Sequence, residues 1–401
     1  MICLFVCDTE FQLLNAMNIK YHLLQNDTAD LLVHNRHLED NGLIERINST
    51  KLFRNVFSYI DELQGLHQYI RDLQNNQRRN RLFEALQNSS KIFYDNLLQK
   101  FSGHEKILSD RINGFNQIKN TAYDEVFAFT NGKVYKSLID YLKKQTSGCK
   151  FNLLDEGVGS YLKTDIDGIE ADTIYLYAPD NAIYSDSLKN IVEIPKIDHN
   201  ESAFIDTINT VFKASNLPHL EINNALIMCD QGFQKMPPYL NNAGKLRKII
   251  FANSYKKHIK NSVLYNEEIR LFKKIIQLMP KREAYIKFHP RYATTMLDEY
   301  DDVNVKMFAE KNLPFELICA NYNIKNTIFI TPFSSSAIMH HSVLGSNDDG
   351  NKYILLHQLM TPQNISPDLN SLYDRLTTNH GDKFFVPKTE NELVDYLACL
   401  K

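Results

Sequence analysis

Two neighbouring acids, a histidine followed by proline and arginine, and a run of three serines are the residues of this 401-residue chain best suited to chemistry. They occur, in this order, in Leu154-Asp155-Glu156-Gly157, Phe288-His289-Pro290-Arg291 and Phe333-Ser334-Ser335-Ser336-Ala337. A carboxylate can take a proton from a hydroxyl group, whereas an imidazole, a guanidinium group and serine hydroxyls can hold a phosphate. Together these groups could move a chemical group from a phosphate to a hydroxyl.

The paired acids follow a short apolar run, residues 151–154, which predicts a strand that Gly157 ends in a sharp turn. Asp155 and Glu156 would then lie at the carboxyl edge of a sheet, where open α/β sheets bind their ligands. Burial beside a second acid would raise the pKa of Asp155 enough for it to act as a general base. The alternative is that both acids are solvated turn residues.

The histidine also follows a predicted buried strand, residues 284–288, and Pro290 holds His289 in an extended conformation. His289 can carry a positive charge near neutral pH, and Arg291 offers a planar fork suited to phosphate. The alternative is a histidine that only hydrogen-bonds a neighbouring loop.

The serine run lies between a predicted strand, residues 326–330, and an apolar helical pattern that continues to residue 344. Free backbone N–H groups at the helix start, with the hydroxyls of Ser334, Ser335 and Ser336 beside them, would bind one phosphate without a metal. The alternative is ordinary helix capping, for which one serine is enough.

In this order, the three motifs resemble the signature of bacterial sialyltransferases, in particular glycosyltransferase family 52 and the related capsular polysialyltransferases. Further matches are Leu176-Tyr177-Ala178-Pro179 and Leu313-Pro314-Phe315-Glu316, so the resemblance spans about residues 1 to 345. It implies an inverting sialyltransferase of the two-domain GT-B arrangement, which uses CMP-sialic acid as donor, a surface glycan such as lipooligosaccharide or capsule as acceptor, and neither a metal nor a cofactor.

The resemblance also implies roles for single residues. Asp155 matches the general base, Glu156 the second acid that supports it, and His289 the group that binds or protonates the phosphate leaving group. Gly157 is the structural turn. The donor-binding residues would be Ser335 and Ser336, with Ser334 leaving the register of the pair open, together with Glu316 on the ribose and the neighbouring Pro290 and Arg291.

Alternating strand and helix patterns predict an α/β fold with two facing Rossmann-like domains. We expect an acceptor-side domain over residues 1–190 with a helical insertion at about 61–118, a linker over 191–222, and a donor-binding domain over 223–401 with a closing C-terminal helix. The opening strand, Ile2 to Cys7, leads into a helix through a turn that lies at the same edge as Asp155. Thr9 and Gln12 could therefore touch the acceptor, although capping the helix is the alternative role.

Twelve strands are expected, and they are listed by residue number: 2–7, 31–34, 56–60, 125–129, 151–154, 173–177, 225–229, 248–252, 284–288, 303–307, 326–330 and 353–356. Helices are expected at 11–24, 203–214, 267–278 and 390–400.

Composition describes an ordinary globular protein, with 43% hydrophobic and 23% charged residues. A net charge of −3 gives no reason to expect a nucleic-acid partner. A basic cluster from Lys245 to Lys260 could contact anionic lipid at the inner membrane surface or the substrate, or form a solvated helix face.

Six scattered cysteines without metal spacing, and a first apolar stretch too short for a signal peptide, indicate a cytoplasmic enzyme. The oligomeric state is not predicted.

Other functions stay open. Asp165-Ile166-Asp167 is the pattern by which other glycosyltransferases bind a divalent cation, although short acidic turns are usually just solvated. The enzyme could use another activated sugar, such as a different CMP-nonulosonate, Kdo or a uridine diphosphate sugar. The chain could also be a non-catalytic binding protein of the same fold.

Overall fold

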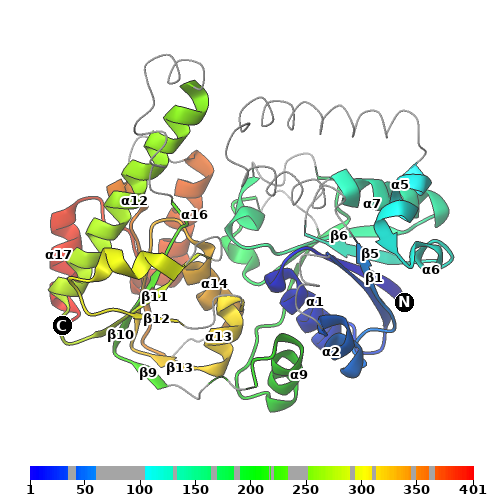
Figure 1. Cartoon of the computed structure of the whole chain (residues 1–401), viewed down its shortest axis with the longest axis horizontal. Coiled ribbons are helices and arrows are strands. Elements are labelled where there is room, and N and C mark those ends of the chain that lie inside the picture. The colour runs from blue at the N-terminus through cyan, green and yellow to red at the C-terminus, as the bar shows by residue number, and fades with distance from the viewer. Residues whose placement is uncertain are drawn as a thin grey trace, which may run out of the picture.

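A computed structural model of the chain describes residues 1–34, 42–59, 104–129, 133–163, 169–184, 190–215, 217, 221–233, 252–289, 294–308, 313–344, 349–360 and 366–401. The sequence folds into two α/β units that lie side by side (Figure 1). Each is built on its own largely parallel sheet, which confirms the expected α/β class with two Rossmann-like domains.

The first sheet has eight strands in the order β4-β3-β2-β1-β5-β6-β7-β8, and only the pairing of β3 with β4 is antiparallel. Its central strands are buried, as continuous apolar runs predict for a parallel sheet covered on both faces. The strands are β1 (Ile2–Cys7), β2 (Thr28–His34), β3 (Val56–Tyr59), β4 (Ile112–Asn113), β5 (Glu125–Ala128), β6 (Lys150–Leu154), β7 (Thr173–Leu176) and β8 (Ile191–Glu193).

The second sheet has six parallel strands in the order β12-β11-β10-β14-β15-β16. They are β10 (Ala225–Cys229), β11 (Glu283–Lys287), β12 (Lys306–Met307), β14 (Ile328–Thr331), β15 (Lys352–Leu355) and β16 (Phe384–Phe385). A small separate sheet pairs β9 (Glu221–Asn223) with β13 (Asn323–Lys325) at the base of this domain (Figure 1).

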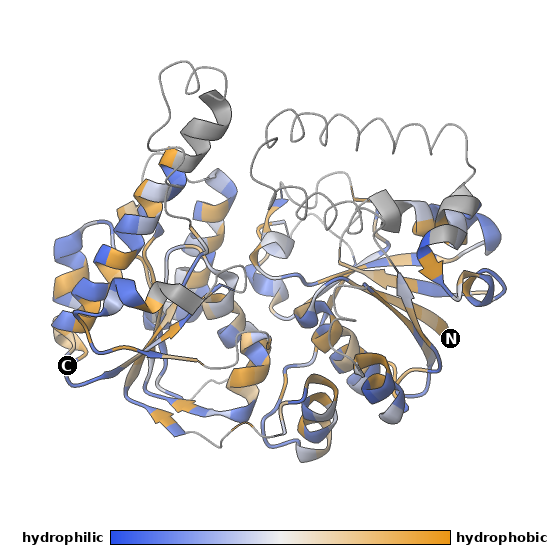
Figure 2. Ribbon diagram, viewed as in Figure 1, coloured by the Kyte–Doolittle hydropathy of each residue, from blue (hydrophilic) through white to orange (hydrophobic). Residues whose placement is uncertain are grey.

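Helices cover both faces of the first sheet. Helices α1 and α2 lie on one side of it, and α5, α6 and α7 lie on the other (Figure 1). The hydrophobic residues gather on the strands and on the helix faces turned toward them, as Figure 2 shows. The bounds are α1 (Glu10–His22), α2 (Leu43–Ser49), α5 (His104–Arg111), α6 (Phe115–Lys119), α7 (Lys133–Gln145) and α9 (Ser202–Phe212), with short 3-10 helices η2 (Val158–Tyr161) and η3 (Pro179–Asn181).

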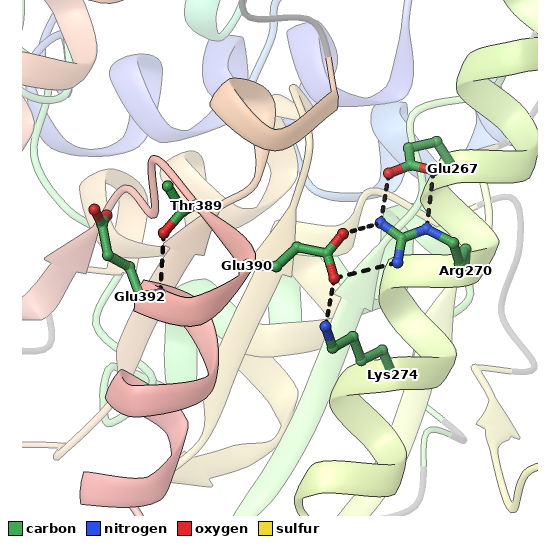
Figure 3. A network of polar contacts seen from close by, with 6 residues as sticks. All are labelled: Glu267, Arg270, Lys274, Thr389, Glu390 and Glu392. Atoms are coloured by element: carbon green, nitrogen blue, oxygen red, sulfur yellow. Dashed lines mark hydrogen bonds and ion pairs between the residues drawn. The ribbon is translucent and has the colours of Figure 1, made fainter.

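In the second domain, the long helix α12 and the C-terminal helix α17 pack on the face of the sheet that holds a separate hydrophobic core. Figure 3 shows the ion pairs between α17 and α12, in which Glu390 pairs with Arg270 and Lys274. The Thr389 hydroxyl caps the start of α17. The bounds are α12 (Ala252–Leu278), η5 (Thr294–Tyr300), α13 (Phe315–Asn321), α14 (Ser335–Leu344), α15 (His357–Met360), α16 (Pro367–His380), η6 (Gly381–Lys383) and α17 (Glu390–Cys399).

The two domains share one continuous core. A single cluster of buried apolar side chains runs from the first sheet into α13 and α14 of the second domain. On the other side of the interface, α16 reaches the first domain at η3, where Asn379 donates to the carbonyl of Asp180 at 3.1 Å and Arg375 donates to the carbonyl of Ala182. The interface is therefore packed, and it holds the carboxyl edges of the two sheets in a fixed relation.

Most expected elements appear close to their predicted positions, but three predictions need correction. Ala252, expected at the end of a strand, begins helix α12, and residues 248–251 lie outside the described residues. The strand expected at 303–307 is only Lys306–Met307. Asn326, expected to begin a strand, has a positive φ of 50°, so it forms a turn before β14.

Two further predictions lie wholly or mostly outside the described residues, and a third differs at the domain boundary. The helical insertion lies mostly outside them, and its described end holds α5, β4 and α6. The side chains of the basic cluster up to residue 258 lie outside them too. Strand β8 pairs with β7, so the first sheet reaches Glu193, inside the stretch expected as a linker. No helix among the described residues is long and apolar enough to cross a membrane.

Candidate functional site

Asp155 lies immediately after β6, at the carboxyl edge of the first sheet, and its side chain is fully buried. Its Oδ1 accepts a hydrogen bond from the Gly157 N–H at 2.8 Å. Its Oδ2 accepts one from the Tyr161 hydroxyl at 2.5 Å and one from the Tyr177 N–H at 3.2 Å. Burial raises the pKa of Asp155 to about 6, because it disfavours the charged form more strongly than these three hydrogen bonds favour it.

Glu156 differs from its neighbour because its side chain is exposed. The buried Gln12 amide lies between two groups: its Nε2 donates to Glu156 at 3.2 Å, and its Oε1 accepts the N–H of Asp8 at 2.5 Å. Thr9 uses its hydroxyl to cap α1 by accepting the Gln12 N–H. The α1 turn thus supports the acid turn, with Gln12 as the direct contact.

His289 lies two residues after β11, and its turn packs on the loop after β10. The carboxylate of Asp230 accepts the N–H of His289 at 3.1 Å, and a Cβ atom added to Gly232 would lie 3.0 Å from Cγ of the His289 ring. Gly232 has a positive φ of 82°, so only glycine fits here without strain and collision. Pro290 and Arg291 lie outside the described residues.

The serine run forms the turn between β14 and α14. The Thr331 hydroxyl accepts the N–H of Ser334 at 2.7 Å, and the buried Ser334 hydroxyl accepts the N–H of Ser336 at 3.3 Å, as an N-cap residue does. Ser335 and Ser336 are the first residues of the helix, and both are half-buried. The capping role that sequence alone left open therefore belongs to Ser334, and Ser335 and Ser336 remain as the pair at the helix start.

The acid motif contacts the serine motif, although the two come from different domains. A Cβ atom added to Gly157 would lie 3.1 Å from Cβ and 3.3 Å from Oγ of Ser335, so the acid turn contacts the start of α14. The ring of Phe333, which directly precedes the serines, packs edge-on against the ring of Phe233, with centroids 6.1 Å apart. Phe233 follows Gly232, which backs the His289 ring. The acid turn thus contacts the serine run directly, and the serine motif is joined to the loop behind His289 through these two phenylalanine rings.

Two further buried charged residues of the second domain, Glu316 and Lys287, belong to this part of the molecule. Glu316, in the first turn of α13, has its pKa raised to about 7 chiefly by burial. The charge on Asp155 raises this pKa further, whereas Lys287 lowers it. Lys287, the last residue of β11, donates to the Phe288 carbonyl at 3.2 Å, and burial lowers its pKa. The charge on Asp155 of the first domain thus acts on the carboxyl group of Glu316 in the second domain.

Several supporting residues had no motif to reveal them. Tyr161 and Tyr177 hold Asp155, and Asp230 with Glu268 hold the loop behind His289. One signal was available: Asp230 directly follows a buried apolar strand, as Asp155 does. Among the described residues, no group of three or more His, Cys, Asp or Glu side chains is arranged to hold a metal ion, and Asp165 and Asp167 lie outside them.

Comparison with known proteins gives a family match over most of the chain. Residues 3–347 match the sequence profile of the alpha-2,8-polysialyltransferase (POLYST) family. A search of curated proteins found no match.

Among solved structures, two glycosyltransferases are remotely similar. CalG4, the calicheamicin glycosyltransferase, is 8% identical with a TM-score of 0.45, over 99% of this chain and 89% of that one. Arabidopsis thaliana UGT89C1 complexed with UDP is 9% identical with a TM-score of 0.42, over 100% of this chain and 90% of that one.

Proposed function

Because the chain belongs to the alpha-2,8-polysialyltransferase family and is thus a sialyltransferase, we propose that it transfers sialic acid from CMP-sialic acid, with inversion and without a metal ion, to a surface glycan. The family description favours the 8-hydroxyl of a terminal sialic acid, in a growing capsule chain, as the acceptor. The observation that carries the proposal is the contact of the acid turn at Gly157 with Ser335 of the opposite domain.

In the proposed reaction, the acceptor oxygen attacks the anomeric carbon of the donor sugar, and the bond from that carbon to the phosphate oxygen breaks. Asp155 takes the proton of the acceptor hydroxyl. A base whose pKa is about 6 is largely ionised at neutral pH and still basic enough to accept a proton in the transition state. Asp155 is fully buried, so side chains that cover it must move before an acceptor hydroxyl can reach its carboxylate.

CMP leaves on the opposite face, where negative charge develops on its phosphate. The N–H groups at the start of α14 and the hydroxyls of Ser335 and Ser336 would hold the phosphate oxygens. His289 would bind or protonate the same phosphate, and Arg291, which follows it in sequence, would add a planar cation. Glu316 would accept hydrogen bonds from the ribose hydroxyls.

These groups suffice to stabilise a monophosphate leaving group, which is why we propose that no divalent ion takes part. Glu156, which Gln12 orients, would support the acid turn from its exposed side.

A direct test is to incubate the protein with CMP-sialic acid and a panel of fluorescent galactosides, mono-sialosides and oligo-sialosides, with and without EDTA. We expect transfer to sialosides that is undiminished by EDTA, with products of increasing length. We also expect CMP, but not UDP, to raise the melting temperature, by an amount equivalent to about 2.7 kcal/mol at a concentration of 100 times its Kd.

Transfer to galactosides alone would replace the proposed acceptor and leave the donor in place. Absence of any transfer from CMP-sialic acid, combined with EDTA-sensitive transfer from a uridine diphosphate sugar, would overturn the proposal.

A further inference from the structure

Two buried carboxyl groups lie directly behind the His289 turn. Asp230, the residue after β10, is 6% exposed, and Glu268, in the middle of the long helix α12, is 1% exposed. The two side chains hydrogen-bond each other. Buried acids are costly unless they are paired, so a pair of them at this place needs an explanation.

The backbone partners of the pair belong to the two loops that carry His289. Oδ2 of Asp230 accepts the N–H of His289 at 3.1 Å and the N–H of Gly232 at 3.2 Å. Oε1 of Glu268 accepts the N–H of Gln231 at 3.0 Å. Since Gly232 backs the His289 ring, these three hydrogen bonds fix the ring from behind as well as its backbone.

A direct hydrogen bond between two carboxyl groups requires one proton between them, because two carboxylates would repel. Burial, followed by the charge of Asp230, raises the pKa of Glu268 well above its ordinary value, so Glu268 holds this proton and donates it to Asp230. Burial also raises the pKa of Asp230, and Lys287 lowers it.

Besides Lys287 on β11, the other titratable groups that interact with the pair are Cys229 at the end of β10 and two tyrosines. Burial raises the pKa of the Cys229 thiol, so it stays neutral. Burial raises the pKa of Tyr265 on α12 and of Tyr300 in η5, so both stay neutral, and Glu299 interacts with each of them. Of these groups, only Lys287 can carry a positive charge. The pair therefore shares its single negative charge mainly through its own hydrogen bond.

We propose that Asp230 and Glu268 are positioning residues of the transferase, which share one proton and thereby hold the His289 turn in the geometry that receives the donor phosphate. The proposal rests on the proposed function in one respect, namely that His289 acts at the donor. Neither acid would touch the substrate, since both act through the backbone of the loops that carry His289.

Amide substitutions of similar shape test the shared proton. In Glu268→Gln, the amide can still donate to Asp230 and accept the Gln231 N–H. In Asp230→Asn, the amide can still accept both loop N–H groups and donate to an ionised Glu268. In the double variant, two amide NH₂ groups face each other, and turning either amide breaks a bond to a loop N–H.

We expect each single variant to stay within about 3-fold of the wild type in kcat/KM for CMP-sialic acid. The double variant should lose about 10-fold or more, through a higher donor KM, with the acceptor KM unchanged. Glu267→Gln, which changes the neighbouring, half-buried acid of α12 that pairs with Arg270, is the matched control and should leave the donor KM unaltered.

Two outcomes would overturn the proposal. A double variant with a normal donor KM, even if its melting temperature fell, would make the pair merely structural. A single variant as impaired as the double would exclude the shared proton.

A second readout is independent of the donor. Hydrogen–deuterium exchange of the His289 amide should accelerate in the double variant and not in Glu267→Gln. If the wild type proved inactive with CMP-sialic acid, the proposed function would fail, whereas faster exchange at His289 would still support the positioning role. Unchanged exchange in the double variant would remove it.

Discussion

Gly157 of the acid turn packs against Ser335 at the start of α14, so the carboxyl edges of the two sheets touch where the proposed base and the proposed phosphate site meet. The contact requires glycine twice over. Its φ of 103° and ψ of −152° belong to a region that is essentially restricted to glycine, and an added Cβ atom would lie 3.1 Å from Cβ of Ser335.

Gly157→Ala should therefore reduce both stability and transfer. Backbone strain should cost about 1–3 kcal/mol, and displacement of the acid turn from Ser335 should lower kcat by about 10-fold or more. Gly148→Ala is the matched control, because Gly148 also has a positive φ, of 91°, but an added Cβ atom would meet nothing within 4 Å. Thermal melting and transfer assays of both variants check this, and an equal loss of kcat in the two would contradict the role of the contact.

The hydrogen bond from Tyr161 to Asp155 should set the acid limb of the pH profile. Asp155 must be ionised to accept a proton, so kcat/KM should fall as the pH drops through about 6. Tyr161→Phe removes a bond that favours the ionised form, so the pKa of Asp155 should rise and the limb should move to higher pH. Tyr184→Phe is the control, because the Tyr184 hydroxyl donates to the Ser160 carbonyl and not to Asp155. The acid limb of its pH profile should stay where it is in the wild type. If the acid limb of Tyr161→Phe stayed in place, a group other than Asp155 would be its cause.

The three serines should divide into one capping residue and two donor-binding residues. Ser334→Ala removes the N-cap of α14 and should cost about 1 kcal/mol of stability. Ser335→Ala and Ser336→Ala should instead raise the KM for the donor by several-fold, on the order of one lost hydrogen bond to a charged group, with little change in melting temperature. Melting curves and donor titrations of the three variants make the comparison. A donor KM that rose only in Ser334→Ala would reverse the assignment.

The ion pairs at the start of α17 should give a small stability that depends on pH. Arg270 and Lys274 lower the pKa of Glu390 to about 2, and its ordinary value is 4.5. A carboxyl group whose pKa is lowered by folding stabilises the fold above its ordinary pKa and loses this effect as the pH falls toward the folded value. Because Glu390 is 38% exposed, solvent screening limits the effect to about 1 kcal/mol or less.

Glu390→Gln should accordingly melt below the wild type at pH 7, and the gap should narrow between about pH 4.5 and 2. Glu392→Gln, whose side chain accepts only the Lys388 N–H among the described residues, should show no such narrowing. A gap for Glu390→Gln that stayed constant down to pH 2 would exclude the ion pairs as its cause.

Sequence patterns predicted the strands and the strand ends well, because apolar runs followed by Gly, Pro or Asp carry that information locally. Strands at residues 2–7 and 225–229 were predicted at their observed bounds. The strand predicted over residues 248–252 was wrong at Ala252, which begins the long helix α12, and residues 248–251 lie outside the described residues. A short apolar run cannot be told from the start of a helix by periodicity alone.

The supporting residues of the site depend on contacts that no local pattern encodes. Tyr161 and Tyr177 reach Asp155 only because η2 and the end of β7 fold over the acid turn. Glu268 reaches Asp230 from the middle of a long helix, where its position beside Glu267 gives no sign of burial. The sequence predicted a desolvated Asp155, but it could not show that Asp155 is fully buried while the neighbouring Glu156 is exposed.

The central claim is that residues from opposite domains act on one pair of substrates, with Asp155 on the acceptor and His289 on the donor. It is tested most directly by measuring, for Asp155→Asn, Glu156→Gln and His289→Ala, both transfer from CMP-sialic acid and the calorimetric Kd for CMP. Asp155→Asn should lose about 10²-fold or more in turnover with an unchanged Kd for CMP, Glu156→Gln should lose far less, and His289→Ala should be impaired in both quantities. Undiminished turnover in Asp155→Asn, or a larger loss in Glu156→Gln, would contradict the account.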